Sequence, residues 1–235
     1  MGKFSKATVA WPFHCGGATW SRRKFYQRPK DAKQGKFITF EGSEGYGKST
    51  QSALVLEYLQ KRNLPVMLLR EPGGVKISEA IREILLDTKS IGMGDECETL
   101  LYMAARAQMV KEVLIPSLKA GKIVICDRFL DSTIAYQGFG NGVDVKCIRQ
   151  LGDFAVQGIT PDLTLLFDID TEKGLSRTNA QKDRIELRSL DYHARVRQGY
   201  LSLAKEEPKR IKVIPVDADK ETIFQRVKVL IDALV

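Results

Sequence analysis

The sequence predicts a three-layer α/β/α fold built on a five-stranded parallel sheet. Five short apolar runs, rich in β-branched residues, alternate with longer segments in which apolar residues recur at helical spacing. The runs are apolar at successive positions, which is typical of strands that are buried on both faces. The intervening segments have the length of crossover helices, and right-handed crossovers place such helices on both sides of a parallel sheet.

The elements follow one another in a regular order. The expected strands are FITF at 37–40, PVMLL at 65–69, KIVIC at 122–126, DLTLLFDI at 162–169 and IKVIPV at 211–216. The expected helices cover residues 50–62, 77–86, 96–118, 144–156, 187–204 and 222–234. Because ligands of parallel sheets bind at the carboxyl ends of the strands, we expect functional residues directly after the apolar runs.

Composition and charge limit the possible functions. The chain has 235 residues, 43% of them hydrophobic, and is therefore expected to form one domain with a sizeable core. Its net charge is +8, but residues 1–36 hold nine of the basic side chains and one acidic one, which leaves 28 of each sign in residues 37–235. The body is neutral, so the charge does not indicate a nucleic-acid partner. We interpret residues 1–36 as a basic extension, disordered or non-native, with a functional arm and a transit peptide as the open alternatives.

The cysteines and the hydropathy pattern argue against a zinc-binding, disulfide-rich, secreted or membrane-spanning protein. Cys15, Cys97, Cys126 and Cys147 show neither CxxC spacing nor a neighbouring histidine, so we expect no zinc site and no disulfide framework. No window approaches the roughly 18 apolar residues of a membrane span, and no signal-peptide pattern is present. We expect a reduced, cytoplasmic protein without a membrane partner.

A phosphate-binding pattern follows the first apolar run. The segment GSEGYGKS matches GxxxxGK[ST] between an expected strand and an expected helix, which is the context that the pattern needs. Glycines let backbone N–H groups surround an anion, Lys48 can reach the outer phosphates, and Ser49 can ligate Mg²⁺. The context favours nucleotide binding over a glycine-rich turn without a ligand. The loop alone does not specify the reaction, because motors, GTPases and small kinases share it. The expected nucleotide-binding residues are Gly42, Ser43, Glu44, Gly45, Tyr46, Gly47, Lys48, Ser49 and Thr50.

Two further motifs follow the next strands. Asp127, at the end of KIVIC, is placed to hold a Mg²⁺-bound water, and Arg128 offers a planar fork for a phosphate. A structural salt bridge between an aspartate and an arginine is the alternative for this pair. The segment REPGG at 70–74 indicates a tight turn when it is taken alone.

Taken in order, FEGSEGYGKST, REPGG, LLYMAARAQ and DRFLDSTIAYQG resemble the thymidylate kinase family, in its bacterial-type branch. The resemblance runs from residue 37 to 235 and excludes the extension. It implies a P-loop NTPase fold of the nucleoside monophosphate kinase type and a homodimer. It also implies Mg²⁺-dependent transfer of the γ-phosphoryl group from ATP to dTMP, giving ADP and dTDP for dTTP biosynthesis. Such transfer requires alignment and positive charge, and neither His14 nor His193 is placed as a general base.

The same resemblance implies an acceptor site. Tyr102 and Arg106 lie four residues apart on one face of an expected helix, and in the family this pair binds thymine by stacking and by a hydrogen bond to a carbonyl oxygen. Without the neighbouring motifs the two would be interpreted as a core aromatic and a surface arginine. The other implied acceptor residues are Arg82 and Arg128 around the dTMP phosphate, Glu71 near it, and Thr133, Tyr136 and Gln137 facing the base and sugar. Glu44 corresponds to an acidic position that approaches the acceptor sugar and Mg²⁺.

The expected lid, at about 171–188, departs from the family pattern. In the bacterial-type branch the lid supplies several arginines, whereas SRTNAQKDRIELR holds fewer. Arg177 and Arg184 are the candidates to neutralise the transferring group, with Lys182 as a poorer substitute. Tyr46 also departs, because the family usually has a small residue there; it either leans over the adenine side or crowds the loop. The expected catalytic residues are Lys48, Asp127, Arg128, Arg177 and Arg184.

Two other functions remain open at this stage. Another nucleoside monophosphate kinase of the same fold would differ in its acceptor pocket. A nucleotide-dependent switch or motor module would bind a partner instead, although GTPases usually carry an NKxD motif that is missing here. The expected homodimer is supported by wide apolar arcs in LLYMAARAQMVKEVL and VKCIRQLGDFAVQGI, which burial against the sheet would explain equally well.

Overall fold

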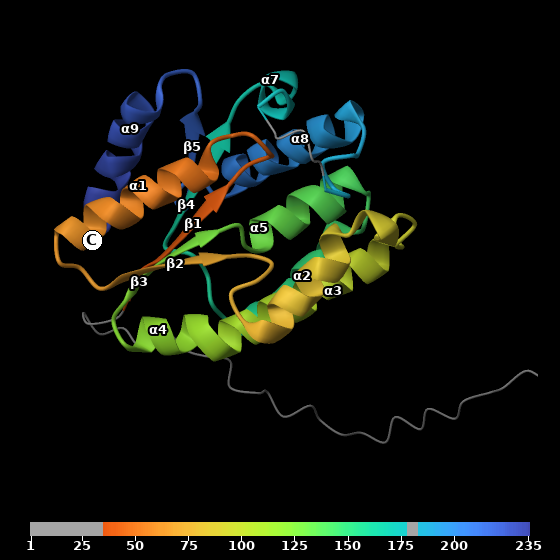
Figure 1. Ribbon diagram of the computed structural model, residues 1–235, viewed down its shortest axis with the longest axis horizontal. Coiled ribbons are helices and arrows are strands. Elements are labelled where there is room, and N and C mark those ends of the chain that lie inside the picture. The colour runs from red at the N-terminus through yellow and green to blue at the C-terminus, as the bar shows by residue number, and fades with distance from the viewer. Residues whose placement is uncertain (1–34, 178–182) are drawn as a thin grey trace, which may run out of the picture.

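The computed structural model describes residues 35–177 and 183–235 (Figure 1). The expected extension over residues 1–36 therefore lies outside the described residues except for its last two positions, and so do Lys182 and the middle of the expected lid. The described chain forms one all-parallel sheet with the strand order β2-β3-β1-β4-β5. Its strands are β1 (Phe37–Glu41), β2 (Val66–Arg70), β3 (Ile123–Asp127), β4 (Leu163–Asp168) and β5 (Ile211–Pro215).

Helices cover both faces of this sheet. They are α1 (Lys48–Lys61), α2 (Lys76–Leu86), η1 (Thr88–Ser90), α3 (Asp95–Met109), η2 (Val110–Leu114), α4 (Ile115–Lys119), α5 (Leu130–Thr133), η3 (Ile134–Gly140), α6 (Val145–Val156), α7 (Thr171–Leu175), α8 (Leu190–Glu206) and α9 (Lys220–Asp232). Helices α1 and α9 pack on one face, while α3 to α6 and α8 supply the buried residues of the other. The predicted three-layer fold is confirmed.

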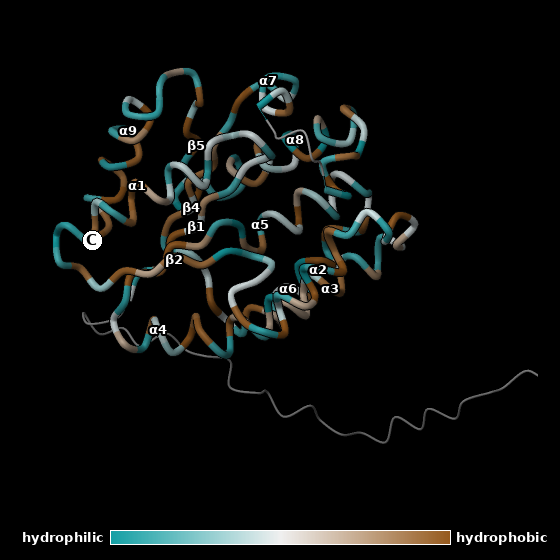
Figure 2. Tube along the Cα trace, viewed as in Figure 1, coloured by the Kyte–Doolittle hydropathy of each residue, from teal (hydrophilic) through white to brown (hydrophobic). Residues whose placement is uncertain are grey.

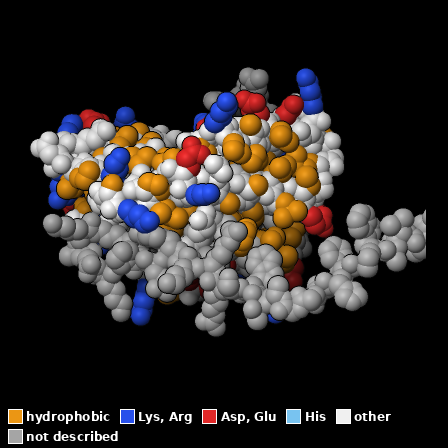
Figure 3. Space-filling model, turned by 90° about the horizontal axis from the view of Figure 1, so that it is seen from below, with side chains coloured by type: hydrophobic (Ala, Val, Ile, Leu, Met, Phe, Trp, Pro, Cys, Tyr) orange, Lys and Arg blue, Asp and Glu red, His pale blue; other side chains and the backbone are white. Residues whose placement is uncertain are grey.

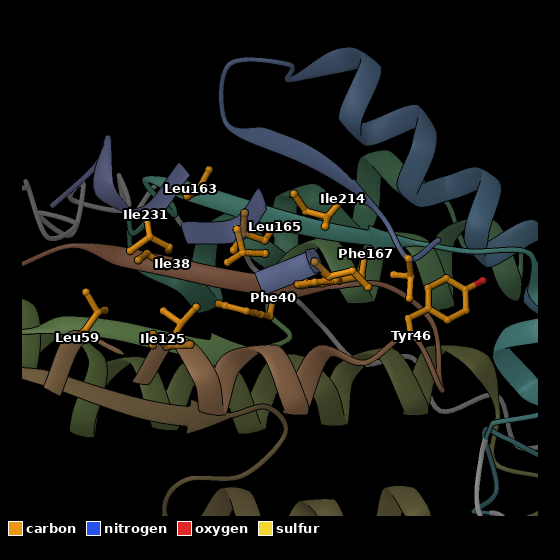
Figure 4. Close-up of a cluster of buried hydrophobic side chains, with 14 of the residues drawn as sticks. Ile38, Phe40, Tyr46, Leu59, Ile125, Leu163, Leu165, Phe167, Ile214 and Ile231 are labelled. Atoms are coloured by element: carbon orange, nitrogen blue, oxygen red, sulfur yellow. The ribbon is translucent and has the colours of Figure 1, made fainter. Parts of the chain in front are cut away.

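The three central strands, β1, β3 and β4, are buried on both faces, as their continuous apolar character predicts, whereas the edge strands β2 and β5 are partly exposed. All five residues of β1 are buried. Ile38 and Phe40 point into the core beneath α1 and α9 (Figure 4), whereas Phe37 belongs to the core on the other face. Hydrophobic residues accordingly concentrate along the strands, and hydrophilic residues on the outer turns (Figure 2). Because Phe40 of β1 and Arg70 of β2 both lie opposite Asp127 of β3, the carboxyl ends of these three strands meet at one edge.

Two wide helical turns interrupt the helices on the second face. The helix expected at 96–118 is continuous from α3 to α4, but η2 is a π-helical turn that immediately precedes Ile115 and Pro116. Proline cannot donate a backbone hydrogen bond, and a local change of helical pitch accommodates such a residue. The second wide turn, η3, continues the short helix α5 in a segment for which the sequence predicted no element.

Within the described residues, no helix combines the length and the apolar character needed to cross a membrane.

Candidate active site

The loop between β1 and α1 is built around three glycines. Gly42, Gly45 and Gly47 have φ values of 131°, 73° and 80°, a region that residues with a side chain rarely adopt. Gly42 also passes close to β4, because a Cβ atom there would lie 2.5 Å from the carbonyl oxygen of Phe167. Helix α1 begins at Lys48, directly after the loop, so its positive N-terminal end faces the space that the loop encloses.

Lys48 is held inside this loop. Its Nζ donates to the carbonyl oxygen of Ser43 at 2.7 Å, and its side chain is buried. Burial lowers the pKa of Lys48 to about 8, and the nearby charge of Arg128 acts in the same direction. A buried ammonium group beside the N-terminal end of a helix has the arrangement that an anionic ligand requires.

A hydroxyl and a carboxylate meet beside the loop. Oγ of Ser49, in the first turn of α1, donates to Oδ2 of Asp127 at 2.9 Å, and Asp127 ends β3. Both are hard oxygen ligands of the kind that Mg²⁺ prefers, and Mg²⁺ usually takes few protein ligands with phosphate oxygens and waters as the rest. The described residues contain no cluster of three or more acidic, histidine or cysteine side chains for a metal. The Ser49–Asp127 pair therefore fits a metal that a nucleotide brings with it. Thr50, next along α1, is exposed.

Arg128 joins the loop to the second motif. Its φ of 73° is unusual for a residue with a side chain, and its guanidinium lies 5.0 Å from the centre of the Tyr136 ring. Nη1 donates to the carbonyl oxygen of Gly42 at 3.0 Å, and Nη2 pairs with Glu44. Burial alone would raise the pKa of Glu44, but the charges of Arg128 and Lys48 outweigh it and lower this pKa. Glu44 is therefore a carboxylate held between two cations.

One cavity brings the predicted residues of both substrates together. Its wall includes Glu44, Lys48, Ser49, Glu71, Arg82, Tyr102, Arg106, Asp127, Arg128, Thr133, Tyr136 and Gln137. The residues of the phosphate loop line one end, and the aromatic and amide side chains of α3 and η3 line the rest. Ser132, Arg70 and Asp183 also line it, although the sequence analysis did not select them. Ser132 and Arg70 lie within the motifs quoted above, so their position was the signal that could have found them.

Arg106 is fixed in the wall of this cavity. Its side chain is 1% exposed and donates to Oε2 of Glu71 from Nε at 2.9 Å and from Nη2 at 2.7 Å. Nη2 also donates to Oγ1 of Thr133 and to the carbonyl oxygen of Phe129, each at 3.0 Å. Burial raises the pKa of Glu71 although Arg106 opposes this shift. The fifth hydrogen bond of Arg106 is weaker, because Nη1 donates to the sulfur of Met103 at 3.3 Å.

The remaining acceptor residues lie around Arg106. Tyr102 is half-buried one turn earlier on α3. Arg82 donates from Nη1 to the carbonyl oxygen of Pro72 at 3.0 Å, and Gln137 donates from Nε2 to Oε1 of Glu98 at 2.8 Å. The hydroxyl of Tyr136 lies 3.3 Å from Glu44. An aromatic ring, an arginine and an amide therefore face a cavity that ends at a phosphate loop.

Comparison with known proteins agrees with this geometry. The model of a family described as thymidylate kinase matches residues 40–227. The chain belongs to the thymidylate kinase family. It is 48% identical over 193 residues to a thymidylate kinase of Kosmotoga olearia, covering 81% of this chain and 92% of that one. It is 42% identical over 199 residues to a thymidylate kinase of Clostridium novyi, covering 83% and 97%. The crystal structure of the thymidylate kinase from Ehrlichia chaffeensis superposes with a TM-score of 0.71 at 37% identity, covering 85% of this chain and 99% of that one. The resemblance inferred from the motifs is confirmed.

Neither lid arginine lines the cavity of this thymidylate kinase site. Arg184 is buried, pairs with Oε2 of Glu98 at 2.6 Å and donates from Nε to the carbonyl oxygen of Leu85, so it does not line the cavity. Arg177 is exposed and lines a second hollow, between the ends of β4 and β5 and helix α7. The structure therefore does not bring Arg184 to the phosphate loop, because an acidic partner on α3 holds it.

Tyr46, at a position where the resemblance implies a small residue, points into the protein. It is 2% exposed and joins the core cluster of Phe167 and Ile214 at the end nearest the loop (Figure 4). Of the two orientations considered from the sequence, the outward one is wrong. The ring therefore anchors the phosphate loop to the hydrophobic core.

Proposed function

We propose that this chain catalyses the transfer of the γ-phosphoryl group of ATP to dTMP, giving ADP and dTDP. The observation that supports this most directly is the cavity that joins Lys48 and Ser49 of the phosphate loop to Tyr102 and Arg106. A cavity of this kind can hold a phosphate donor and a nucleotide acceptor end to end, which is the alignment that phosphoryl transfer needs. The names of the relatives agree with it.

On the donor side, the loop amides and Lys48 would hold the ATP phosphates. Ser49 and Asp127 would hold Mg²⁺, since their side-chain oxygens are already adjacent. When bound, Mg²⁺ would neutralise charge on the outer phosphate oxygens. Lys48 would contribute a positive charge that is buried before the substrate arrives, so little reorganisation is needed at the moment of transfer.

On the acceptor side, Tyr102 would stack on the thymine ring and Arg106 would donate to a base carbonyl oxygen. Nη1 of Arg106 suits this role because the sulfur of Met103 is a weak acceptor that a carbonyl oxygen can replace. Arg82 and Arg128 would contact the dTMP phosphate, and Thr133, Tyr136 and Gln137 would face the base and sugar. Arg128 would then exchange its contact with Glu44 for the phosphate, which leaves Glu44 to a sugar hydroxyl or to Mg²⁺.

A homodimer is part of the same proposal. Ile77 and Ile84 of α2, Leu100 of α3 and Phe154 of α6 are each about half exposed, at 54%, 49%, 53% and 56%. Helix α3 lies between α2 and α6, and hydrophobic side chains gather on this side of the molecule (Figure 3). An exposed apolar patch of this kind is typical of an interface between protein chains, and most soluble oligomers are two-fold dimers. A cytoplasmic location would follow from substrates that are free nucleotides.

A panel of acceptors tests the activity. ADP release with ATP and Mg²⁺ would be measured with dTMP, dUMP, dCMP, dGMP and AMP, and with the Lys48→Ala variant as the background. We expect the largest kcat/KM for dTMP. Preference for a purine monophosphate would point to another kinase of the same fold, and ATP turnover that no monophosphate stimulates would point to a switch module.

A further inference from the structure

Glu41, the last residue of β1, is buried beneath the active site. Its side chain is 0% exposed and does not line the cavity. Its Oε1 accepts from the backbone N–H of Phe129 at 2.7 Å. Its Oε2 accepts from Oγ of Ser132 at 2.6 Å and from the hydroxyl of Tyr200 at 3.0 Å. One carboxylate thus connects β1 to the turn after β3 and to helix α8.

Each partner of Glu41 acts on Arg128. Phe129 follows Arg128 directly, so the bond to its N–H holds the turn in which Arg128 has a φ of 73°. The oxygens of Ser132 and Tyr200 are 2.7 Å apart, and each accepts from Nη1 of Arg128 at 3.3 Å. Glu41 therefore binds the groups that fix Arg128: the N–H of Phe129, which holds its backbone turn, and the hydroxyls of Ser132 and Tyr200, which contact its guanidinium.

The hydrogens of the two hydroxyl groups show why a carboxylate is needed. Each hydroxyl has one hydrogen to donate and can accept with its lone pairs. Ser132 and Tyr200 have two hydrogens for their contact with each other and their two contacts with Oε2, so with an ionised Glu41 at least one hydroxyl donates to Oε2 and both keep lone pairs that accept from Nη1 of Arg128. A group that donates at position 41 would remove this acceptor and direct a hydroxyl hydrogen toward the cation.

A purely structural role explains these contacts less well. Burial of a carboxylate is costly unless its hydrogen bonds compensate. Here burial and the charge of Asp131 raise the pKa of Glu41 to about 7, while Ser132, Arg128 and Phe129 oppose the shift. An apolar side chain at the end of this core strand would avoid the cost. What a carboxylate adds is its effect on the orientation of Arg128.

We propose that Glu41 is a positioning residue for phosphoryl transfer, which orients Arg128 toward the acceptor phosphate through Phe129, Ser132 and Tyr200. This inference rests on the role proposed for Arg128. It predicts that Glu41 affects dTMP use without touching either substrate.

The Glu41→Gln variant tests this directly, because it keeps the size of the side chain and replaces one acceptor oxygen with a donor. We expect kcat/KM for dTMP to fall about tenfold while KM for ATP changes by no more than about twofold, as for a displaced alignment group. Thr39→Val is the matched control. Thr39 is also 0% exposed on β1 and faces the same side, but its hydroxyl contacts Thr164 and not the Arg128 turn. We expect Thr39→Val to leave both kinetic constants unchanged within about twofold.

A double-mutant cycle separates positioning from loss of structure. In an Arg128→Ala background, Glu41→Gln should have almost no further effect on kcat/KM for dTMP, because the residue through which Glu41 acts is gone. If Glu41→Gln lowered kcat/KM for dTMP by the same factor in that background as in the natural protein, the inference about Glu41 would be overturned. The role of Arg128 would be unaffected by that result. If Arg128→Ala itself kept full kcat/KM for dTMP, the role of Arg128 and the inference would both be wrong. A rise in KM for ATP in Glu41→Gln as large as the rise in KM for dTMP would also overturn the inference.

Discussion

The ring of Tyr46 lies directly against Gly174 of α7. A Cβ atom at position 174 would come within 2.2 Å of Cε1 of Tyr46. The neighbouring Gly45 touches the same turn, since a Cβ atom there would lie 2.0 Å from the carbonyl oxygen of Gly174. The phosphate loop and the first helix after β4 are therefore packed as one unit, and the large residue at 46 requires the absence of a side chain at 174.

Whether Gly174→Ala lowers or raises the free energy of unfolding should depend on residue 46. In the natural sequence we expect a loss of about 1–3 kcal/mol in the free energy of unfolding, because the added methyl group overlaps the ring. In a Tyr46→Ala background the same change should be neutral or stabilising by up to about 1 kcal/mol, since alanine is the better helix former. Denaturant unfolding of the four proteins measures both effects. A Gly174→Ala protein as stable as its parent in the presence of Tyr46 would contradict the packing.

Lys48 should be essential for transfer and dispensable for folding. Its Nζ contacts one carbonyl oxygen, that of Ser43, inside a loop that glycine conformations already fix. We expect Lys48→Ala to lower kcat by at least about a hundredfold, as for loss of a charge that acts in the transition state. Circular dichroism and the unfolding midpoint should stay at the level of the parent. Lys61→Ala, on the exposed last turn of the same helix, is the control that should keep full activity. Full activity of Lys48→Ala would remove the phosphate-loop assignment.

The same lysine should influence stability at alkaline pH. Its folded pKa of about 8 lies below its usual 10.5, so between these values the unfolded chain binds more protons and stability rises with pH. Relative to Lys48→Met, the natural protein should gain on the order of 3 kcal/mol across this window. The difference between the two unfolding free energies, measured from pH 7 to 10.5, isolates this contribution from other titrating groups. A constant difference would mean that the ammonium group is not destabilised by burial.

Removal of Arg106 should affect both base binding and stability. We expect Arg106→Ala to raise KM for dTMP far more than KM for ATP. It would also leave the carboxylate of Glu71 buried without its partner, which costs about 3–5 kcal/mol. Glu71→Gln in the same chain should recover part of this stability, because a neutral amide is cheaper to bury. Arg149→Ala, which breaks an exposed pair with Glu206, should cost no more than about 1 kcal/mol. Equal rises in both KM values would mean that the base pocket is misplaced.

The sequence predicted the elements whose hydrophobic period is regular. All five strands and the six long helices lie where the pattern placed them, with ends that differ by a few residues. The segment that forms α5 and η3 was missed because LDSTIAYQGFG has two glycines and no apolar stripe at helical spacing. Contacts with α8 and α6 hold it instead, and tertiary contacts of this kind are not visible in a local pattern.

The sequence could predict those site residues that lie within the quoted motifs. Residues 42–50 run from the end of β1 into the start of α1, and Asp127, Arg128 and Phe129 follow the end of β3, as the pattern of strands and helices predicts. The motifs assign no role to Glu41, since its partner Tyr200 lies 159 positions away. Arg184 was selected by counting arginines in the lid, and that count says nothing about Glu98, an acidic residue on another helix that holds it.

The two lid arginines should therefore respond differently to substitution. Arg184→Met removes one of four donors to Glu98, whose side chain is 0% exposed and also receives Arg188, Gln137 and Asn141. We expect a loss of about 2–3 kcal/mol in unfolding free energy, with kcat nearly unchanged below the unfolding transition. Arg177 is exposed and lies beside the phosphate loop, since a Cβ atom at Gly45 would come within 3.4 Å of its Cβ atom, so Arg177→Ala should keep its stability and lose kcat. The opposite result for Arg184, a stable protein with a large loss of kcat, would show that substrates draw its guanidinium away from Glu98 to the transferring group.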